Sequence, residues 1–262
     1  MAVGEFDGKV VFITGTGSGM GRVAALAFAA AGATIAGADF NEAGNRETRD
    51  AVLAAGGTMH IGAPVDLTAD QAVAAWVDSA VAALGRIDVL YANAGATKFS
   101  PVAETPIQEW DWVMRRELDI VFLPVKYAWP HLQTSSGSIV LVGSTAGVAG
   151  SMTNTRLAHS ATKGGVIAMT KQLAAEGAPH GIRVNCVSPG MVATPATARD
   201  LLAPEHPMNQ IARAIPLGRV GEANEVVECA LFLASPRASY VTGANLMVDG
   251  GWSAVLPGFG MI

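Results

Sequence analysis

ITGTGSGMG, residues 13 to 21, is the stretch that decides the fold. Its glycines at 15, 19 and 21 fall between an apolar strand-like run, KVVFI at 9–13, and an alanine-rich helical run from about 19 to 31. Glycine permits a tight turn and a close backbone approach there, and the N-terminus of the following helix offers N–H groups to a pyrophosphate. The stretch therefore predicts a dinucleotide site, although the same glycine pattern also occurs as a plain turn between a strand and a helix.

Strand-like and helical runs continue to alternate along the rest of the chain. Apolar runs predict strands at 33–38, near Met59, at 87–92, 138–142 and 182–187, and near Leu246. Helical patterns predict helices at 42–54, at 69–84 with Thr68 as the N-cap, within 107–132, at 156–176 and at 222–234. This alternation with short links predicts an α/β fold in one domain, with a doubly wound parallel sheet and helices on both faces.

The composition agrees with a buried parallel sheet and argues against several classes of partner. Half of the 262 residues are hydrophobic and only 15% are charged, which suits a sheet covered on both faces. The net charge of −5 argues against nucleic acid as a partner, because phosphate binding draws on clustered Lys and Arg. The longest uncharged run, 23–38, is shorter than a bilayer span, so no membrane association is expected.

The amino-terminal stretch and the cysteines bear on the cellular compartment. MAVGEFDGK mixes acid and base without an apolar segment, which is not typical of a signal peptide, so a cytoplasmic location is expected. Cys186 and Cys229 lie in runs that predict a strand and a helix, and two buried thiols are favoured over a disulfide.

Acidic and amide side chains follow several predicted strands. Asp39 comes directly after the second strand, Asp66 after the third, and Asn93-Ala94-Gly95 after the fourth. Because the carboxyl ends of parallel strands meet at one edge of a sheet, we expect these residues to lie together. Asp39 could accept hydrogen bonds from both ribose hydroxyls of an adenosine and would repel a 2′-phosphate, which favours NAD over NADP. The alternative is that Asp39 only caps the next helix.

Motifs spread over nearly the whole chain resemble those of the short-chain dehydrogenase/reductase family, in the same order. TGTGSGMG at 14–21 is similar to the TGxxxGxG cofactor motif, and NAG at 93–95 to the NNAG motif. SIVLVGSTAG at 138–147 resembles the strand that ends in the catalytic serine, which places that role on Ser144. SPGMVAT at 188–194 and VTGANLMVDGG at 241–251 resemble two later motifs. The resemblance implies a Rossmann sheet of about seven strands, a homotetramer, and reversible hydride transfer between NAD(P) and an alcohol or carbonyl substrate.

The resemblance and the strand-end pattern together assign the cofactor site. NAD is the expected cofactor, with Lys163 holding its ribose and residues of the SPGMVAT motif lining its nicotinamide. The predicted cofactor-binding residues are Gly15, Ser18, Gly19, Met20, Gly21, Asp39, Asp66, Leu67, Asn93, Ala94, Gly95, Lys163, Pro189, Gly190, Val192 and Thr194.

The catalytic segment departs from the family pattern at two places. In RLAHSATKGG, 156–165, His159 stands where the family has a tyrosine four residues before the lysine, and Glu117 stands where it has an asparagine. His159 and Lys163 share one face of a helix, so the pair keeps its geometry while its acid changes. Imidazole titrates near neutrality and can move a proton, although a lysine ammonium beside it disfavours the imidazolium. We therefore hypothesise that His159 is the acid/base, Lys163 holds the ribose, Ser144 orients the substrate oxygen, and Glu117 balances charge or holds a relay water.

Three functions stay open on the sequence alone. The leading hypothesis is an NAD-dependent oxidoreductase that interconverts a secondary alcohol and a ketone. The alternatives are a catalytically silent NAD-binding protein, in which His159 is inert, and a lyase or dehydratase that uses His159 and Glu117 for proton transfer. The segment 191–219 predicts a substrate lid with an apolar lining. Arg156 is either a solvated charge or an anion-binding group, and no pair of histidines has the spacing of a metal site.

Overall fold

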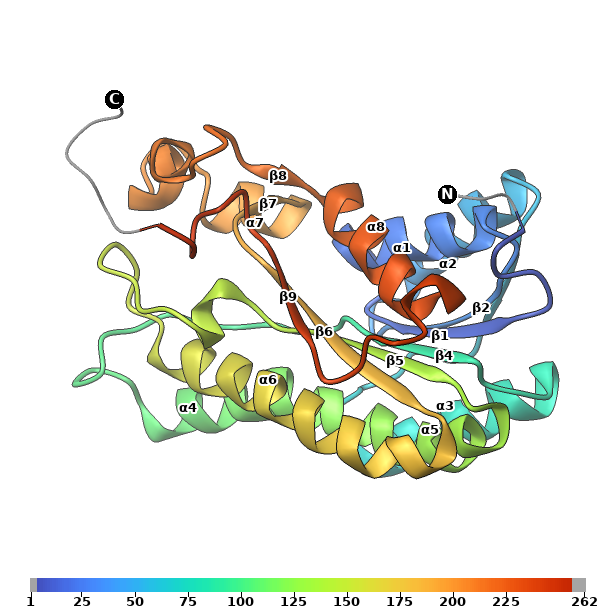
Figure 1. Ribbon diagram of the computed structural model, residues 1–262. Coiled ribbons are helices and arrows are strands. Elements are labelled where there is room, and N and C mark those ends of the chain that lie inside the picture. Colours follow the sequence, from blue (N-terminus) through green and yellow to red (C-terminus); the bar gives the residue numbers. More distant parts are fainter. Residues whose placement is uncertain (1–3, 256–262) are drawn as a thin grey trace.

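Seven parallel strands form the centre of the molecule (Figure 1). The computed structural model describes residues 4–255, so the first three residues of the amino-terminal stretch discussed above lie outside the described part. The strands are β1 (Val10–Thr14), β2 (Thr34–Ala38), β3 (Thr58–Ile61), β4 (Val89–Ala92), β5 (Ser138–Val142), β6 (Arg183–Pro189) and β9 (Asn245–Val248). Their order is β3-β2-β1-β4-β5-β6-β9, and each neighbouring pair is parallel. The predicted doubly wound parallel sheet is confirmed.

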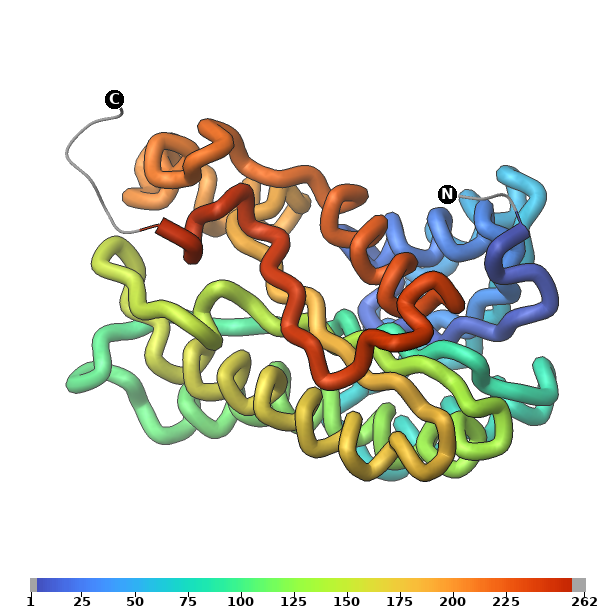
Figure 2. Tube along the Cα trace, viewed as in Figure 1, coloured from blue at the N-terminus to red at the C-terminus, as the bar shows by residue number. Residues whose placement is uncertain are grey.

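The chain builds this sheet outward from β1 in two directions, as the colours of Figure 2 allow the reader to follow. It first adds β2 and β3 on one side of β1, and then returns to the other side for β4, β5, β6 and β9. The strand order therefore reverses between β1 and β4. Ligands of open α/β sheets bind beyond the carboxyl ends of the strands at such a reversal, so the topology itself points to the ends of β1 and β4.

Helices cover both faces of the sheet (Figure 1). One face carries α1 (Gly19–Ala30), α2 (Glu42–Ala54) and α8 (Ala223–Ala234). The opposite face carries α3 (Asp70–Leu84), α4 (Ile107–Met114), α5 (Ile120–Ser135) and α6 (Leu157–Gly177). Both faces of each central strand are thereby buried, which is why the strands read as continuous apolar runs.

Alternate residues of β1 belong to different cores. Phe12 packs against Trp76 of α3 with ring centroids 5.3 Å apart, in a cluster that also holds Val166 of α6. Ile13 points to the other face and shares a cluster with Phe28 of α1. This alternation is the period of two expected of a strand, and it places the carboxyl end of β1 between two packed layers.

The predicted long helix contains an unpredicted wide turn. The chain is helical from Ile107 to Ser135, but residues Arg115–Asp119 between α4 and α5 form a π-helix. Glu117 lies in this turn and is 3% exposed. A π turn inside an α-helix is often found at a functional site, because the extra residue redirects the side chains around it.

The predicted cap of α3 is wrong. The helix begins at Asp70 with Ala69 in the N-cap position, and no side chain among the described residues caps it. Thr68 instead donates its hydroxyl (2.7 Å) and its backbone N–H (2.9 Å) to Oδ1 of Asp66. The Thr68 hydroxyl therefore hydrogen-bonds to the Asp66 carboxylate and does not accept from a backbone N–H at the start of α3.

The segment 191–219 is folded rather than irregular. It contains β7 (Val192–Ala193), α7 (Pro195–Asp200) and a 3₁₀ helix, η4 (Pro207–Ala214), and β7 pairs with β8 (Gly221–Glu222) in a small second sheet. A buried apolar cluster of its own holds the segment together, formed by Met191, Met208, Ile211 and Ile215. The apolar residues that suggested a substrate lining thus pack largely on one another.

Both cysteines are free thiols, as expected. Cys186 on β6 is fully buried, but Cys229 on α8 is only half-buried, so the expectation of two buried thiols holds for one of them. Burial raises the pKa of both thiols. Within residues 4–255, none of the helices combines the length and apolar character needed to cross a membrane.

The glycine loop between β1 and α1 depends on a close backbone contact. Gly15 adopts a left-handed φ of +79°, and a Cβ on Gly21 would lie 1.9 Å from the Gly15 carbonyl oxygen and 2.8 Å from Nδ2 of Asn93. A backbone oxygen cannot rotate out of the way, so any side chain at 21 forces α1 away from the loop.

Substitution Gly21→Ala tests this contact. We expect the free energy of unfolding, measured by urea denaturation, to fall by about 1–3 kcal/mol because the methyl group overpacks the loop. The control is Gly62→Ala, where no atom lies within 4 Å of the added Cβ, and it should change stability by no more than about 0.5 kcal/mol. Equal stability of the two variants would contradict the close-contact argument.

Candidate active site

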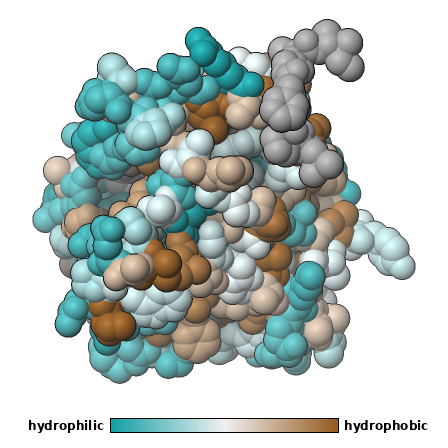
Figure 3. Space-filling view, turned by 90° about the vertical axis from the view of Figure 1, so that its left-hand side faces the viewer, coloured by the Kyte–Doolittle hydropathy of each residue, from teal (hydrophilic) through white to brown (hydrophobic). Residues whose placement is uncertain are grey.

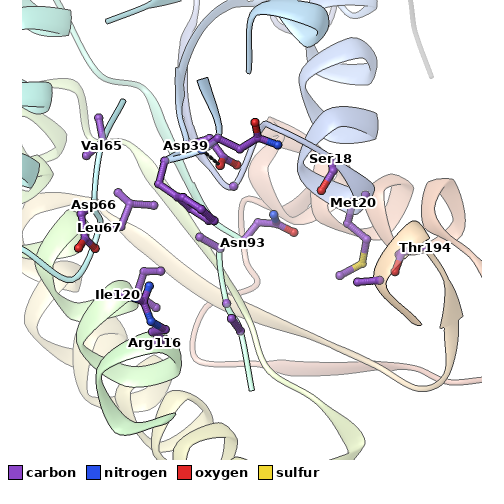
Figure 4. Close-up of a pocket in the computed structure, with 18 of the residues that line it drawn as sticks. Ser18, Met20, Asp39, Val65, Asp66, Leu67, Asn93, Arg116, Ile120 and Thr194 are labelled. Atoms are coloured by element: carbon purple, nitrogen blue, oxygen red, sulfur yellow. Dashed lines mark hydrogen bonds between the residues drawn. The ribbon is translucent and has the colours of Figure 1, made fainter. Parts of the chain in front are cut away.

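A cleft of about 300 Å³ opens at the carboxyl ends of the strands where the order reverses (Figure 4). In Figure 4, Asp66, Leu67 and Arg116 lie on one side, Ser18, Met20 and Thr194 on the other, and Asp39 and Asn93 between them. Most of the predicted cofactor residues line this cleft: Gly15, Ser18, Gly19, Met20, Asp39, Asp66, Leu67, Asn93, Ala94, Gly95 and Thr194. Residues from five separate segments are thus brought together.

The other predicted cofactor residues lie beside this cleft and do not line it. Gly21 packs beneath the loop. Lys163 is buried and donates from Nζ to the Val142 carbonyl (2.9 Å). Pro189 ends β6, the N–H of Gly190 donates to the Val248 carbonyl (3.0 Å), and Val192 lines a second cleft of about 220 Å³.

The Asp39 carboxylate faces the glycine loop. Its Oδ2 accepts from the N–H of Gly17 (2.7 Å) and its Oδ1 from the N–H of Asn41 (2.8 Å). The N-cap of α2 is Asn41, whose side chain accepts from the N–H of Gly44 (3.1 Å), so the alternative that Asp39 caps this helix is wrong. Each carboxylate oxygen has further lone pairs, which can accept hydroxyl groups of a ligand in the cleft.

The cleft has features that fit a dinucleotide. Oδ1 of Asn93 is buried and finds no hydrogen-bond partner among residues 4–255, while its Nδ2 donates to the Thr14 carbonyl (3.1 Å). A buried acceptor of this kind calls for a donor from a bound group. A Cβ on Gly95 would meet no atom nearer than 3.8 Å, and one on Gly19 would stop 3.7 Å from Thr194, so both glycines leave room over the loop. α1 begins at Gly19 and directs its N-terminus at this space.

Arg116 is a lining residue that the sequence did not reveal. Its guanidinium lies over the ring of Trp112, 5.0 Å from the centroid, and it lies on the same side of the cleft as Asp66. Hydrogen bonds from the Thr68 side chain and backbone hold the pKa of Asp66 below its usual range, and Arg116 adds a weaker attraction. The other lining residues that were not predicted are Phe40, Asn41, Val65, Ala96, Ile120, Pro195 and Ala196. Phe40 and Asn41 could have been found as direct neighbours of Asp39, and Arg116 as the neighbour of Glu117.

His159 and Glu117 meet in a buried hydrogen-bonded pair. Nδ1 of His159 lies 2.8 Å from each carboxylate oxygen of Glu117. The hydroxyl of Thr162, one turn along α6, donates to Oε2 of Glu117 (2.7 Å). The imidazole is 15% exposed and the carboxylate 3%, so the pair sits at the edge of the interior with the ring on the outer side. The hypothesis that Glu117 reaches His159 agrees with this geometry.

Lys163 and Ser144 lie on elements that flank this pair. Lys163 follows His159 by four residues on α6, and its Nζ is 3.8 Å from where a Cβ on Gly95 would lie. The buried ammonium therefore borders the cleft at Gly95. Ser144 follows β5 and is half-buried, and its Oγ accepts from the N–H of Ala146 (3.1 Å) at the start of a short 3₁₀ turn.

Phe99 forms one wall of the histidine site. Its ring stands edge-on to the imidazole of His159, with centroids 5.9 Å apart. Phe99 belongs to the loop after β4, and no sequence pattern identified it. An aromatic wall restricts the directions from which a substrate or water reaches the imidazole. Nothing in the described chain resembles a metal site, since no three His, Cys, Asp or Glu residues gather there.

Comparisons with known proteins agree with this architecture. A family model described as enoyl-(acyl carrier protein) reductase matches residues 15–253. The chain is 38% identical over 251 residues to 3-oxoacyl-(acyl-carrier-protein) reductase of Thermotoga maritima, covering 94% of this chain and 98% of that protein. It is 37% identical over 253 residues to meso-2,3-butanediol dehydrogenase of Serratia marcescens, covering 95% and 96%.

A solved structure has the same fold as this chain. A short-chain type dehydrogenase/reductase from Mycobacterium marinum matches with a TM-score of 0.89 and 32% identity, covering 94% of this chain and 96% of that one. The likeness extends over the whole sheet and both helical layers. The chain therefore belongs to the short-chain dehydrogenase/reductase family of oxidoreductases, whose members use a nicotinamide cofactor.

Proposed function

We propose that this enzyme is an NAD-dependent oxidoreductase that interconverts a secondary alcohol and a ketone, with His159 as its acid/base. The observation that carries the proposal is the contact of His159 Nδ1 with both carboxylate oxygens of the buried Glu117, at 2.8 Å each. The relatives named as butanediol and cyclopentanol dehydrogenases act, by their names, on alcohols of this kind.

The contact decides which ring nitrogen is available for chemistry. An ionised carboxylate only accepts hydrogen bonds, so Nδ1 must carry the proton that it donates to Glu117. In the neutral ring Nε2 is then unprotonated and can take a proton from a substrate hydroxyl, and the imidazolium that results is stabilised by the carboxylate. In the reverse direction the imidazolium returns the proton to the substrate oxygen. Glu117 thus orients the imidazole and offsets the repulsion from the Lys163 ammonium.

The remaining roles follow from position. His159 takes the place of the family tyrosine and Glu117 that of the family asparagine. Ser144, at the end of β5, orients the substrate oxygen by a hydrogen bond from its hydroxyl. Lys163 holds the cofactor ribose, since its ammonium borders the cleft at Gly95. When bound, the nicotinamide supplies the hydride exchange with the substrate carbon.

The residues around the adenosine end favour NAD. Asp39 presents a carboxylate at the carboxyl end of β2, where it would accept ribose hydroxyls and repel a 2′-phosphate. Arg22, which follows the glycine loop, forms a salt bridge with Glu47 (2.8 Å) and donates to the carbonyls of Gly17 and Gly44. Its guanidinium is therefore already used in holding α1 to α2.

The loops after β4 and β5 and the segment 191–219 gather at the end of the molecule that faces the viewer in Figure 3, and we place the substrate there. In that view hydrophobic patches stand among hydrophilic ones. Val102, on the loop after β4, and Val148 and Met152, on the loop after β5, are exposed. Segment 191–219 is the lid of this site. Hydroxyl Oγ1 of Thr153 contacts Sδ of Met208 (3.2 Å) and so joins the lid to the loop before α6. The homotetramer and the cytoplasmic location stay predictions.

Substitution His159→Gln tests the acid/base role. We expect kcat with NADH and a good ketone substrate to fall roughly 10²- to 10⁴-fold, because the proton donor is lost while the side-chain volume is largely kept. NADH binding, followed by fluorescence, should change by less than about twofold. His180→Gln, at an exposed histidine beyond α6, is the control. A loss of less than about twofold in kcat would remove His159 from catalysis.

The same assay separates the other functions. Tight NADH binding with no turnover over a broad panel of alcohols and ketones would support a catalytically silent protein. Elimination of water from a hydroxy substrate, without any change in NADH absorbance, would support a dehydratase. Turnover that consumes NADH with any member of the panel excludes both.

Substitution Asp39→Asn tests cofactor preference. Neutralising the carboxylate while keeping its shape should raise the NADP-to-NAD ratio of kcat/KM by about tenfold or more, because like-charge repulsion of the 2′-phosphate is removed. Glu42→Gln, an exposed change on the first turn of α2 outside the cleft, should leave the ratio unchanged. An unchanged ratio in Asp39→Asn would mean that Asp39 does not select the cofactor.

A further inference from the structure

Arg156 lies one helical turn before His159, and only some of its hydrogen-bond donors have acceptors. It occupies the N-cap position of α6 and is half-buried. Its Nη2 donates to the Ala149 carbonyl (3.0 Å), but its Nε is buried and has no hydrogen-bond partner among residues 4–255. Burial lowers the pKa of this guanidinium, which nevertheless stays charged at neutral pH. A buried donor of a charged group without an acceptor is costly, so its retention calls for an explanation.

Other arginines of the chain have acceptors or carboxylates for their guanidinium groups. Arg183 is also half-buried, and its two terminal nitrogens donate to the carbonyls of Leu233, Ala234 and Ser235. The more exposed Arg86 and Arg219 pair with carboxylates of Asp88 and Glu225. Arg156 forms no salt bridge with any carboxylate of residues 4–255, and one carbonyl is its sole acceptor there. Its charge has no counterpart in the described chain.

Arg156 contacts the segments that carry the proposed catalytic residues. Ala149, which it contacts, follows Ser144 on the same short loop, and His159 follows Arg156 on α6. The loop between them is joined to the lid through Thr153 and Met208 (3.2 Å). The first turn of α6 has neither a capping side chain nor an acidic residue, so the positive end of the helix adds to the same charge. Two positive features therefore meet at the start of α6, one turn before His159.

We propose that Arg156 binds a carboxylate of the substrate, so that the preferred substrates are hydroxy acids and their oxo acids. This rests on the proposed function, since it places the carboxylate relative to the same carbon that is oxidised or reduced. A carboxylate supplies the negative charge that the guanidinium lacks, and it accepts from the terminal nitrogens, because Nε itself is buried. The planar fork of arginine binds carboxylates in a bidentate manner, which also fixes how the substrate is turned toward His159. Arg156 is thus a specificity-determining residue.

The experiment compares acids with their own esters. A panel of short 2-oxo and 3-oxo acids, each beside its methyl ester, is reduced with NADH by the wild-type enzyme and by Arg156→Gln and Arg156→Lys. Each pair has the same ketone and differs only in charge. We expect the wild type to prefer the acid by at least tenfold in kcat/KM. In Arg156→Gln, the KM for the acid should rise at least tenfold while kcat/KM for the ester changes less than twofold.

Two further measurements keep a folding defect apart from a loss of recognition. Butanoate should inhibit ester reduction competitively, with a Ki at least tenfold higher in Arg156→Gln. Arg156→Lys, which keeps the charge but not the fork, should fall between the wild type and Arg156→Gln. Arg46→Gln, an exposed change on α2, is the control for the loss of a positive charge. Retained ester turnover shows that each variant is folded.

The outcomes separate the two proposals. Reduction of esters with no preference for acids, or an acid KM that Arg156→Gln leaves unchanged, overturns the role of Arg156 while the oxidoreductase function stands. No NADH-linked turnover of acid, ester or any neutral ketone overturns the proposed function and this inference with it. Acid preference that is lost in Arg156→Gln and partly kept in Arg156→Lys supports both.

Discussion

The burial of the Glu117 carboxylate is the constraint on which the active site depends. A carboxylate that is 3% exposed is costly unless charged or polar groups compensate it, and here the imidazole of His159 and the hydroxyl of Thr162 do so. Both partners lie on one face of α6, so this single side chain fixes the helix against the π turn between α4 and α5. It also fixes the tautomer of the imidazole, because an ionised acceptor at Nδ1 leaves Nε2 free of its proton. The acid/base role that we propose for His159 therefore follows from the hydrogen bonds that compensate the buried Glu117 carboxylate.

The sheet supplies the frame for this arrangement. The reversal of strand order between β1 and β4 brings the glycine loop, Asp39 and Asn93 to one edge, and Gly21 packs closely against Gly15 within that loop. Lys163 links the two halves of the site. Its ammonium is anchored on β5 through the Val142 carbonyl and borders the cleft at Gly95, while its helix carries His159. The cleft and the pair of His159 and Glu117 are thus connected through α6 and β5, and we propose that the loops and the segment 191–219 select the substrate.

The sequence predicts the parts of this structure that depend on local pattern. Short, mostly apolar runs identify the strands, and residues placed directly after them, such as Asp39 and Asn93, fall in the cleft because strand ends share an edge. The sequence does not predict the parts that depend on contacts between residues distant along the chain. A π turn has no periodicity of its own in a helical run, so neither the burial of Glu117 nor the position of Arg116 could be read. The predicted N-cap role of Thr68 is wrong because its hydroxyl donates to Asp66, and this contact depends on the geometry of the loop. Likewise, Phe99 meets His159 only through the fold.

The central claim is that Glu117 holds the proton of His159 on Nδ1 and leaves Nε2 as the catalytic nitrogen. Nitrogen NMR of the enzyme labelled with ¹⁵N-histidine tests it most directly, because the two tautomers of the neutral ring give different ¹⁵N signals. The chain contains five histidines, so the His159 signals are assigned by their loss in His159→Gln. We predict that the neutral ring carries its proton on Nδ1, with Nε2 unprotonated. A neutral ring protonated on Nε2 would contradict the account, since Nδ1 could then not donate to the carboxylate and the nitrogen proposed for catalysis would already be blocked.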